Sequence, residues 1–104
     1  MSTFNPDPNG VGAVIGIGAT QVFTVTTSNA QSTAFGANTT MIRIAATQGH
    51  CHFAIGANPT ASTTTSPIMP INDTEYIKVV PGQKIAFIKD AAVTISTVSV
   101  TELT

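Results

Sequence analysis

The sequence is poor in charge and in residues that favour helices. Only 9% of its 104 residues are charged, and the formal net charge is −1. Leucine occurs once and glutamate twice. This composition excludes a helical bundle. The four Lys and Arg residues stand singly, whereas a protein that binds nucleic acid through phosphates needs clustered basic residues. We therefore expect no nucleic-acid partner.

Cysteine is also nearly absent. Cys51 is the single cysteine, so an intrachain disulfide is excluded. The first residues lack the basic and apolar regions of a signal peptide. The apolar stretch 11–19 is broken by glycine and is much shorter than the roughly 20 residues of a membrane span. These absences predict a protein made in the cytoplasm, or one that draws its stability from oligomerisation, and one without a membrane partner.

The scarcity of charge bears on partners as well. Surfaces of free monomers commonly carry about a quarter or more charged residues. This chain has instead 18 Thr and 7 Ser. We therefore expect other chains to cover much of its surface, with Thr and Ser forming the solvated remainder.

What the sequence does contain favours strands. Val, Ile and Thr together make up 38 of the 104 residues, and their β-branched side chains suit a pleated surface. Short apolar alternations are separated by turn signals about every ten residues, and no strand–helix alternation occurs. The pattern predicts an all-β antiparallel β-sandwich, of jelly-roll type, with about seven to eight short strands. We expect a flexible N-terminal arm over residues 1–10 and a single sandwich domain over 11–104.

Turn signals suggest how some strands pair. Gln48-Gly49 predicts a hairpin between strands 41–46 and 50–55, and Pro81-Gly82 predicts a second one between 74–80 and 84–89. A further strand is expected over 21–27, and residues 67–71 are expected to form an extended edge segment. The segments 28–40 and 56–70 read as loops, the first anchored by Phe35. In the last strand, 93–103, a change of apolar phase indicates a bulge or kink at Ser96-Thr97.

Period-two alternation selects the residues that face the interior. The predicted core comprises Phe23, Val25, Ile42, Ile44, Cys51, Phe53, Ile55, Ile77, Val79, Ile85, Phe87 and Val100.

His50 and His52 are the most specific candidates for chemistry. On a strand, residues two apart share a face, so the two imidazoles would supply half of a tetrahedral metal site. A third ligand is not evident, although in a trimer three chains would supply six imidazoles around an axis. The more ordinary interpretation is a polar outer face beside a turn. We therefore expect no bound metal or other cofactor, with His50 and His52 as the candidates should one exist.

Other constellations give no catalytic site. Cys51 would face away from both histidines, which excludes a Cys–His nucleophile pair and favours a buried, hydrophobic role. Asp73 and Asp90 lie in turn sequences, where Asp binds its own backbone. The glycines of residues 10–18 lack the helix that a dinucleotide-binding loop requires. The sequence predicts no catalytic residue and favours a protein that is not an enzyme.

A few side chains are of the types enriched at the centres of protein interfaces. Tyr76 and Lys78 share one strand face, and Met41 and Arg43 share another. Phe4 lies in the predicted arm. These five residues are the interface candidates.

Most of the chain after residue 40 resembles small virion structural proteins of tailed bacteriophages. The resemblance spans residues 41–104 and is carried by IRIA (42–45), HCHFAIGANPTA (50–61), EYIKVVPGQKIAFI (75–88) and VSVTEL (98–103). It implies a small β-sandwich on a capsid or tail, often as a trimer.

Composition and resemblance together favour a capsid decoration, or cement, protein on the virion surface. Its expected partners are the major capsid protein or other virion proteins, and copies of itself in a homo-oligomer, with a trimer as the resemblance implies. The arm and the Thr-rich loop 58–66 would make the contacts. Two alternatives remain at this point: a trimeric tail or fibre component that holds a metal through His50 and His52, and a small carbohydrate-binding jelly roll.

Overall fold

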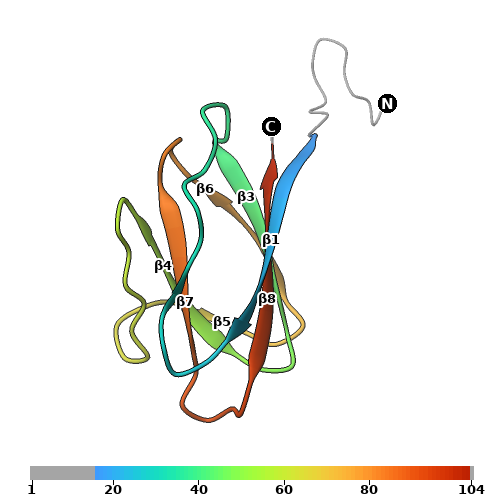
Figure 1. Ribbon diagram of the computed structural model, residues 1–104. Helices are drawn as coiled ribbons and strands as arrows, with labels where there is room; N and C mark the ends of the chain where they lie inside the picture. Colours follow the sequence, from blue (N-terminus) through green and yellow to red (C-terminus); the bar gives the residue numbers. More distant parts are fainter. Residues whose placement is uncertain (1–15, 104) are drawn as a thin grey trace.

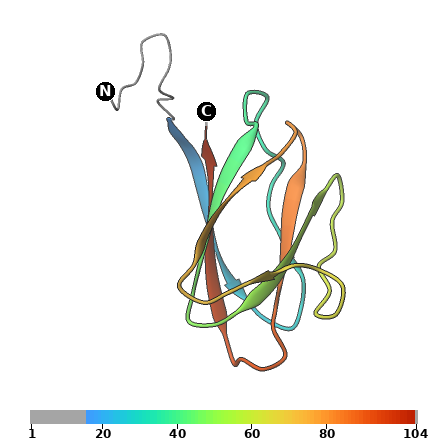
Figure 2. The same ribbon diagram turned by 180° about the vertical axis from the view of Figure 1, so that it is seen from behind.

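The chain folds into two antiparallel four-stranded sheets packed face to face. The computed structural model describes residues 16–103. Figure 1 and the reverse view in Figure 2 show the two layers of strands, with the ends of the described chain at the same end of the sandwich. The strands are β1 (Ile17–Val25), β2 (Ala30–Gln31), β3 (Met41–Thr47), β4 (Cys51–Gly56), β5 (Ile68–Met69), β6 (Thr74–Lys78), β7 (Lys84–Lys89) and β8 (Ser96–Leu103).

The strand order is that of a jelly roll. One sheet has the order β1-β8-β3-β6 and the other β2-β7-β4-β5. Consecutive strands lie in different sheets in every case except β4 and β5, so the chain passes back and forth across the core. The predicted fold class is therefore confirmed, and residues 16–103 form one sandwich. The predicted arm, residues 1–10, lies outside the described residues.

Both predicted hairpins are wrong. β3 pairs with β6 and β8, and β4 pairs with β5 and β7, so the turn at Gln48-Gly49 leads from one sheet to the other. The turn at Pro81-Gly82 forms as predicted, with Gly82 at φ 89° and the Gln83 N–H donating to the Val80 carbonyl. It too connects strands of different sheets. Local turn chemistry fixes a change of direction but does not determine which layer the next strand joins.

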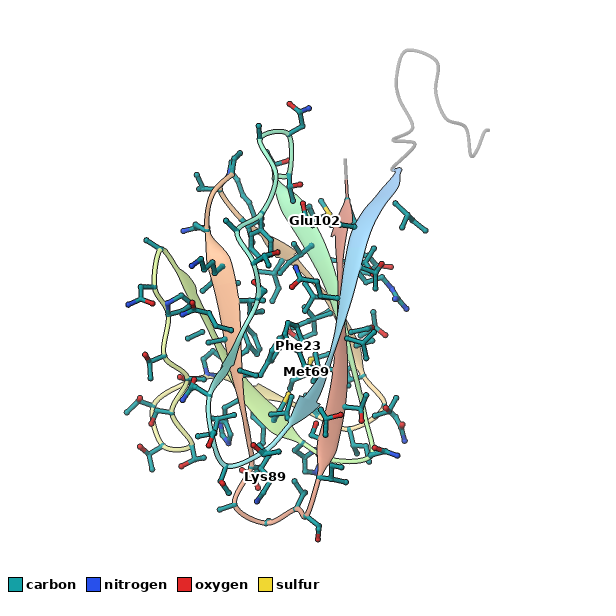
Figure 3. All side chains as sticks on the ribbon, in the orientation of Figure 1. Phe23, Met69, Lys89 and Glu102 are labelled. Atoms are coloured by element: carbon teal, nitrogen blue, oxygen red, sulfur yellow. The ribbon has the colours of Figure 1, made fainter. Side chains whose placement is uncertain are left out.

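The predicted core is confirmed. All twelve predicted core residues belong to the hydrophobic cluster between the sheets, with Phe23, Ile55 and Ile77 partly buried. Phe35 anchors its loop as expected, with 3% of its surface exposed. The rings of Phe23 and Phe87 lie 5.7 Å apart and join the two layers. Figure 3 shows Phe23 and Met69 pointing into the space between the sheets.

Local expectations in two segments need correction. The segment 28–40 contains a short strand, β2, which pairs with β7. Residues 93–95 precede β8 rather than belonging to it, which accounts for the change of apolar phase without a bulge at Ser96-Thr97. The register shift of this sheet lies instead in β1, between Ile17 and Thr20. The predicted edge segment is confirmed as β5, the edge strand beside β4.

A buried carboxylate fixes one end of the sandwich. Glu102 lies on β8 with 8% of its surface exposed. Its Oε1 accepts hydrogen bonds from the Gly36 N–H at 3.0 Å and the Thr39 hydroxyl at 2.5 Å. It thereby ties the loop between β2 and β3 to β8.

No helix in the described part of the chain is long and apolar enough to cross a membrane.

Candidate binding face

The outer faces of the two sheets differ in what covers them. The loop between β4 and β5 lies over the outer face of β2-β7-β4-β5. The Asn29 amide donates to the Ala61 carbonyl at 3.0 Å and accepts from the Ala61 N–H at 2.7 Å. Gln31 donates to the Pro59 carbonyl. Ala86, in the middle of this sheet, is fully buried in consequence.

The outer face of the other sheet has no such cover among the described residues. We call it the binding face, and it comprises the outward side chains of β1, β8, β3 and β6: Ile17, Thr20, Val22, Thr24, Met41, Arg43, Ala45, Thr47, Thr74, Tyr76, Lys78, Thr97, Ser99, Thr101 and Leu103. Ile17, Val22 and Tyr76 are 79, 67 and 63% exposed.

Four of the five interface candidates come together on this face. Met41 lies opposite Lys78, and Arg43 lies opposite Tyr76, in neighbouring pairs of β3 and β6. The sequence placed these pairs on separate strands without showing that the strands are neighbours. The fifth candidate, Phe4, lies outside the described residues.

An open groove of about 450 Å³ crosses the binding face. Ile17 and Thr20 line it from β1, Arg43 and Tyr76 from β3 and β6, and Thr101 and Leu103 from β8 between them. The hydroxyls of Thr20 and Thr101 lie 3.0 Å apart and hydrogen-bond each other. The groove therefore combines an aromatic ring, a guanidinium group, hydroxyls and apolar side chains.

The charge of the binding face is entirely positive within residues 16–103. It carries Arg43 and Lys78, whereas Glu102 is buried on the inner side and Glu75 lies opposite the inward residue Ile44. The single ion pair of the described residues joins His52 and Asp90, so neither Arg43 nor Lys78 has a carboxylate partner there. An unpaired guanidinium beside an exposed tyrosine suits a partner that presents carboxylates.

His52 does not point into solvent as the strand pattern predicted. It is on the outer side of β4, but the long loop leaves only 7% of its surface exposed. Its Nε2 lies 2.8 Å from Asp90 Oδ1 and its Nδ1 lies 3.0 Å from the Ser66 carbonyl. Both neighbours only accept hydrogen bonds, so both contacts form when the ring is a doubly protonated imidazolium.

The titration of the pair follows from these contacts. Burial alone lowers the pKa of His52, but the hydrogen bonds to Ser66 and Asp90 and the charge of Asp90 outweigh it and raise the pKa above 6.5. The hydrogen bond from His52 contributes most to lowering the pKa of Asp90 below 3.8, and the Ala92 N–H adds to it. The sequence identified Asp90 as a turn residue, but could not show that its turn lies beside His52.

The two histidines do not form a metal site of the predicted kind. His50 precedes β4, and its Nδ1 accepts a hydrogen bond from the Ile71 N–H at 2.8 Å. Both nitrogens of His52 are engaged within its own sandwich, which prevents the ring from reaching a metal on an axis between chains. No group of three or more potential metal ligands occurs among residues 16–103.

Cys51 and Asp73 behave as the sequence predicted. Cys51 faces the core, and burial raises the pKa of its thiol to about 11, although a hydrogen bond with Ser96 opposes the shift. Such a thiol is a poor nucleophile at neutral pH. Asp73 accepts a hydrogen bond from the N–H of Thr74, next to it in the chain.

The His52–Asp90 pair predicts a pH-dependent contribution to stability. The contribution of His52 is present below pH 6.5 and disappears as the pH rises through its higher folded-state pKa. The contribution of Asp90 is present above pH 3.8 and disappears as the pH falls through its lower folded-state pKa. Replacing Asp90 by Asn should therefore lower the free energy of unfolding more at pH 5 than at pH 8.5, as measured by urea denaturation.

Asp73→Asn serves as the matched control. Asp73 lies in a turn and is not paired with a histidine in the described structure. Its replacement should change stability equally at the two pH values. A loss in Asp90→Asn that is the same at both pH values would contradict the ion pair.

Comparison of the chain with protein-family models, curated protein sequences and solved structures found no match.

Proposed function

We propose that this chain is a structural protein of a bacteriophage virion, a decoration protein that binds the outer surface of the capsid shell through its binding face. The observation that carries the proposal is the asymmetry of the sandwich. One outer face is covered by the chain's own loop, and the other presents Arg43 and Tyr76. Arginine and tyrosine are among the residues that most often dominate binding energy at protein interfaces.

The partner that suits this face is a protein surface with carboxylates. Arg43 can bind a carboxylate with two parallel hydrogen bonds, and Tyr76 offers a large side chain that loses little conformational entropy on binding. The resemblance of residues 41–104 to small virion proteins supports the major capsid protein as that partner. Repetition of the contact over many copies would strengthen attachment without a stronger single contact.

The decisive experiment uses virions of the phage that encodes the chain. Heads that lack the protein are mixed with the purified full chain, and bound protein is measured after sedimentation. We expect the wild type to bind and the double variant Arg43→Glu/Tyr76→Ala to lose at least about tenfold in affinity. Lys84→Glu alters a cation on the other sheet and should bind as the wild type does.

Imaging of the complete particles locates the protein. Density on the shell at sites occupied by this chain supports the decoration role, whereas density on the tail supports the alternative of a tail or fibre component. Equal binding by the double variant and the wild type would remove the binding face from the mechanism.

A carbohydrate-binding module is the second candidate function. It is favoured by the groove, which the Tyr76 ring and the hydroxyls of Thr20 and Thr101 line together. A glycan array probed with the full chain separates the two functions. Binding that is specific for one glycan class and lost in Tyr76→Ala would support the carbohydrate module, and heads would then not bind the protein.

A further inference from the structure

The four edges of the two sheets differ in how open they are to another strand. The edges are β1 and β6 in one sheet and β2 and β5 in the other. β2 and β5 have only two residues each, and β6 has five residues, including Glu75 and Lys78. Short length and charged side chains are two of the devices that prevent edge strands from pairing with other chains.

β1 is the exception. It has nine residues, IGATQVFTV, and contains neither a charge nor a proline. The register shift between Ile17 and Thr20 interrupts its first part, but residues 20–25 pair with β8 without interruption. Within residues 16–103, its backbone hydrogen bonds are those of the ladder with β8. Val25 is fully buried, so the outward-directed N–H and C=O groups of residues 20–24 are those available to a further strand.

We propose that β1 pairs with β1 of a second copy of this chain, antiparallel and about a two-fold axis at Val22. An antiparallel pair of identical strands is complementary to itself under such an axis. Because residues 20–25 carry no charge, self-pairing brings no like charges together. Val22, now 67% exposed, would lie directly opposite its counterpart, and Thr20 would lie opposite Thr24.

The positive charges of the binding face do not oppose this pairing. Arg43 lies on β3, which is separated from β1 by β8. In the joined sheet, β3 of one copy would lie five strand spacings, or about 24 Å, from β3 of the other. This distance exceeds the Debye length of about 8 Å at physiological ionic strength, so repulsion between the two arginines is screened.

The dimer would contain one continuous eight-stranded sheet. Both copies of the binding face would lie on the same side of this sheet, next to each other and related by a half-turn about the axis. The pairing does not depend on the proposed function, because it follows from the edge itself. It differs from the trimer that the resemblance implies, and the two are distinguishable by mass.

Light scattering after gel filtration of the full chain, over a dilution series, tests the proposal. The wild type should have twice the chain mass of 10.7 kDa. Val22→Lys and Val22→Glu should each have the mass of a single chain, because the axis would place two like charges in contact. An equimolar mixture of the two variants should return to twice the chain mass, because residue 22 then faces an opposite charge.

The control is Val80→Lys, which introduces the same charge at a 58% exposed valine between β6 and β7. It should keep the mass of the wild type. Circular dichroism and thermal melting establish that each variant is folded. A wild type of one or three chain masses, a Val22→Lys variant of unchanged mass, or a mixture that stays at one chain mass would each overturn the proposal.

Discussion

Replacing Phe87 by alanine is expected to lower the free energy of unfolding by about 3–5 kcal/mol. Phe87 lies on β7 between β2 and β4, is fully buried, and packs against Phe23 of the opposite sheet. The substitution removes the contact between the layers and leaves a cavity that the surrounding strands cannot fill. Because small domains are stable by only about 5–15 kcal/mol, the variant should be close to unfolding at physiological temperature.

Urea denaturation followed by circular dichroism measures this loss. Tyr76→Ala is the matched control, because it removes an aromatic ring of similar size that is 63% exposed. We expect that control to change stability by less than about 1 kcal/mol. Similar losses in the two variants would show that Phe87 is not a central contact of the core.

Replacing Gly49 by alanine is expected to cost stability at the upper end of the roughly 1–3 kcal/mol of overpacked sites. A Cβ at this position would lie 2.3 Å from the Ile95 carbonyl oxygen and 3.1 Å from a methyl carbon of Val93. The first obstacle is backbone, so a side-chain rotation cannot relieve it. Ser96 also donates a hydrogen bond to the Gly49 carbonyl, which fixes the two segments against each other.

Gly56→Ala provides the comparison, because no heavy atom beyond Gly56 and its two chain neighbours lies within 4 Å of the position that a Cβ would take. Its stability should equal that of the wild type or exceed it slightly, since alanine reduces the entropy of the unfolded chain. Thermal or urea denaturation of both variants gives the difference. Equal stability of the two variants would mean that the crossing at Gly49 has room to adjust.

Strands β3 and β4 and the turn between them illustrate which parts of the fold were predictable. Alternation of side chains is a local property, and it correctly assigned Ile42 and Ile44 to the core and Arg43 to the outer face of the sheet. The sheet that a strand joins depends on contacts far away in the sequence. The turn at Gln48-Gly49 resembles that of a hairpin, but Gly49 packs beneath Ile95, where no local pattern could have placed it.

The same distinction explains the outcome at the candidate sites. The sequence identified Arg43 and Tyr76 as interface residues by their type, and the pairing of β3 with β6 brought them together. It misjudged His52, because the pattern of a strand cannot show that a distant loop will cover its outer side. Asp90 and Glu102 were missed as partners for the same reason, since each acts on residues at least 38 positions away.

The order of the strands has a consequence for folding during synthesis. β8 lies between β1 and β3, so β1 has no partner strand in the sheet that carries the binding face until β8 has left the ribosome. Until then β1 and β3 expose apolar strands without their shared neighbour. We expect folding to be slow and late, as is typical of topologies dominated by distant pairings. The exposed strands of the nascent chain would then be prone to aggregation during the interval before β8 arrives.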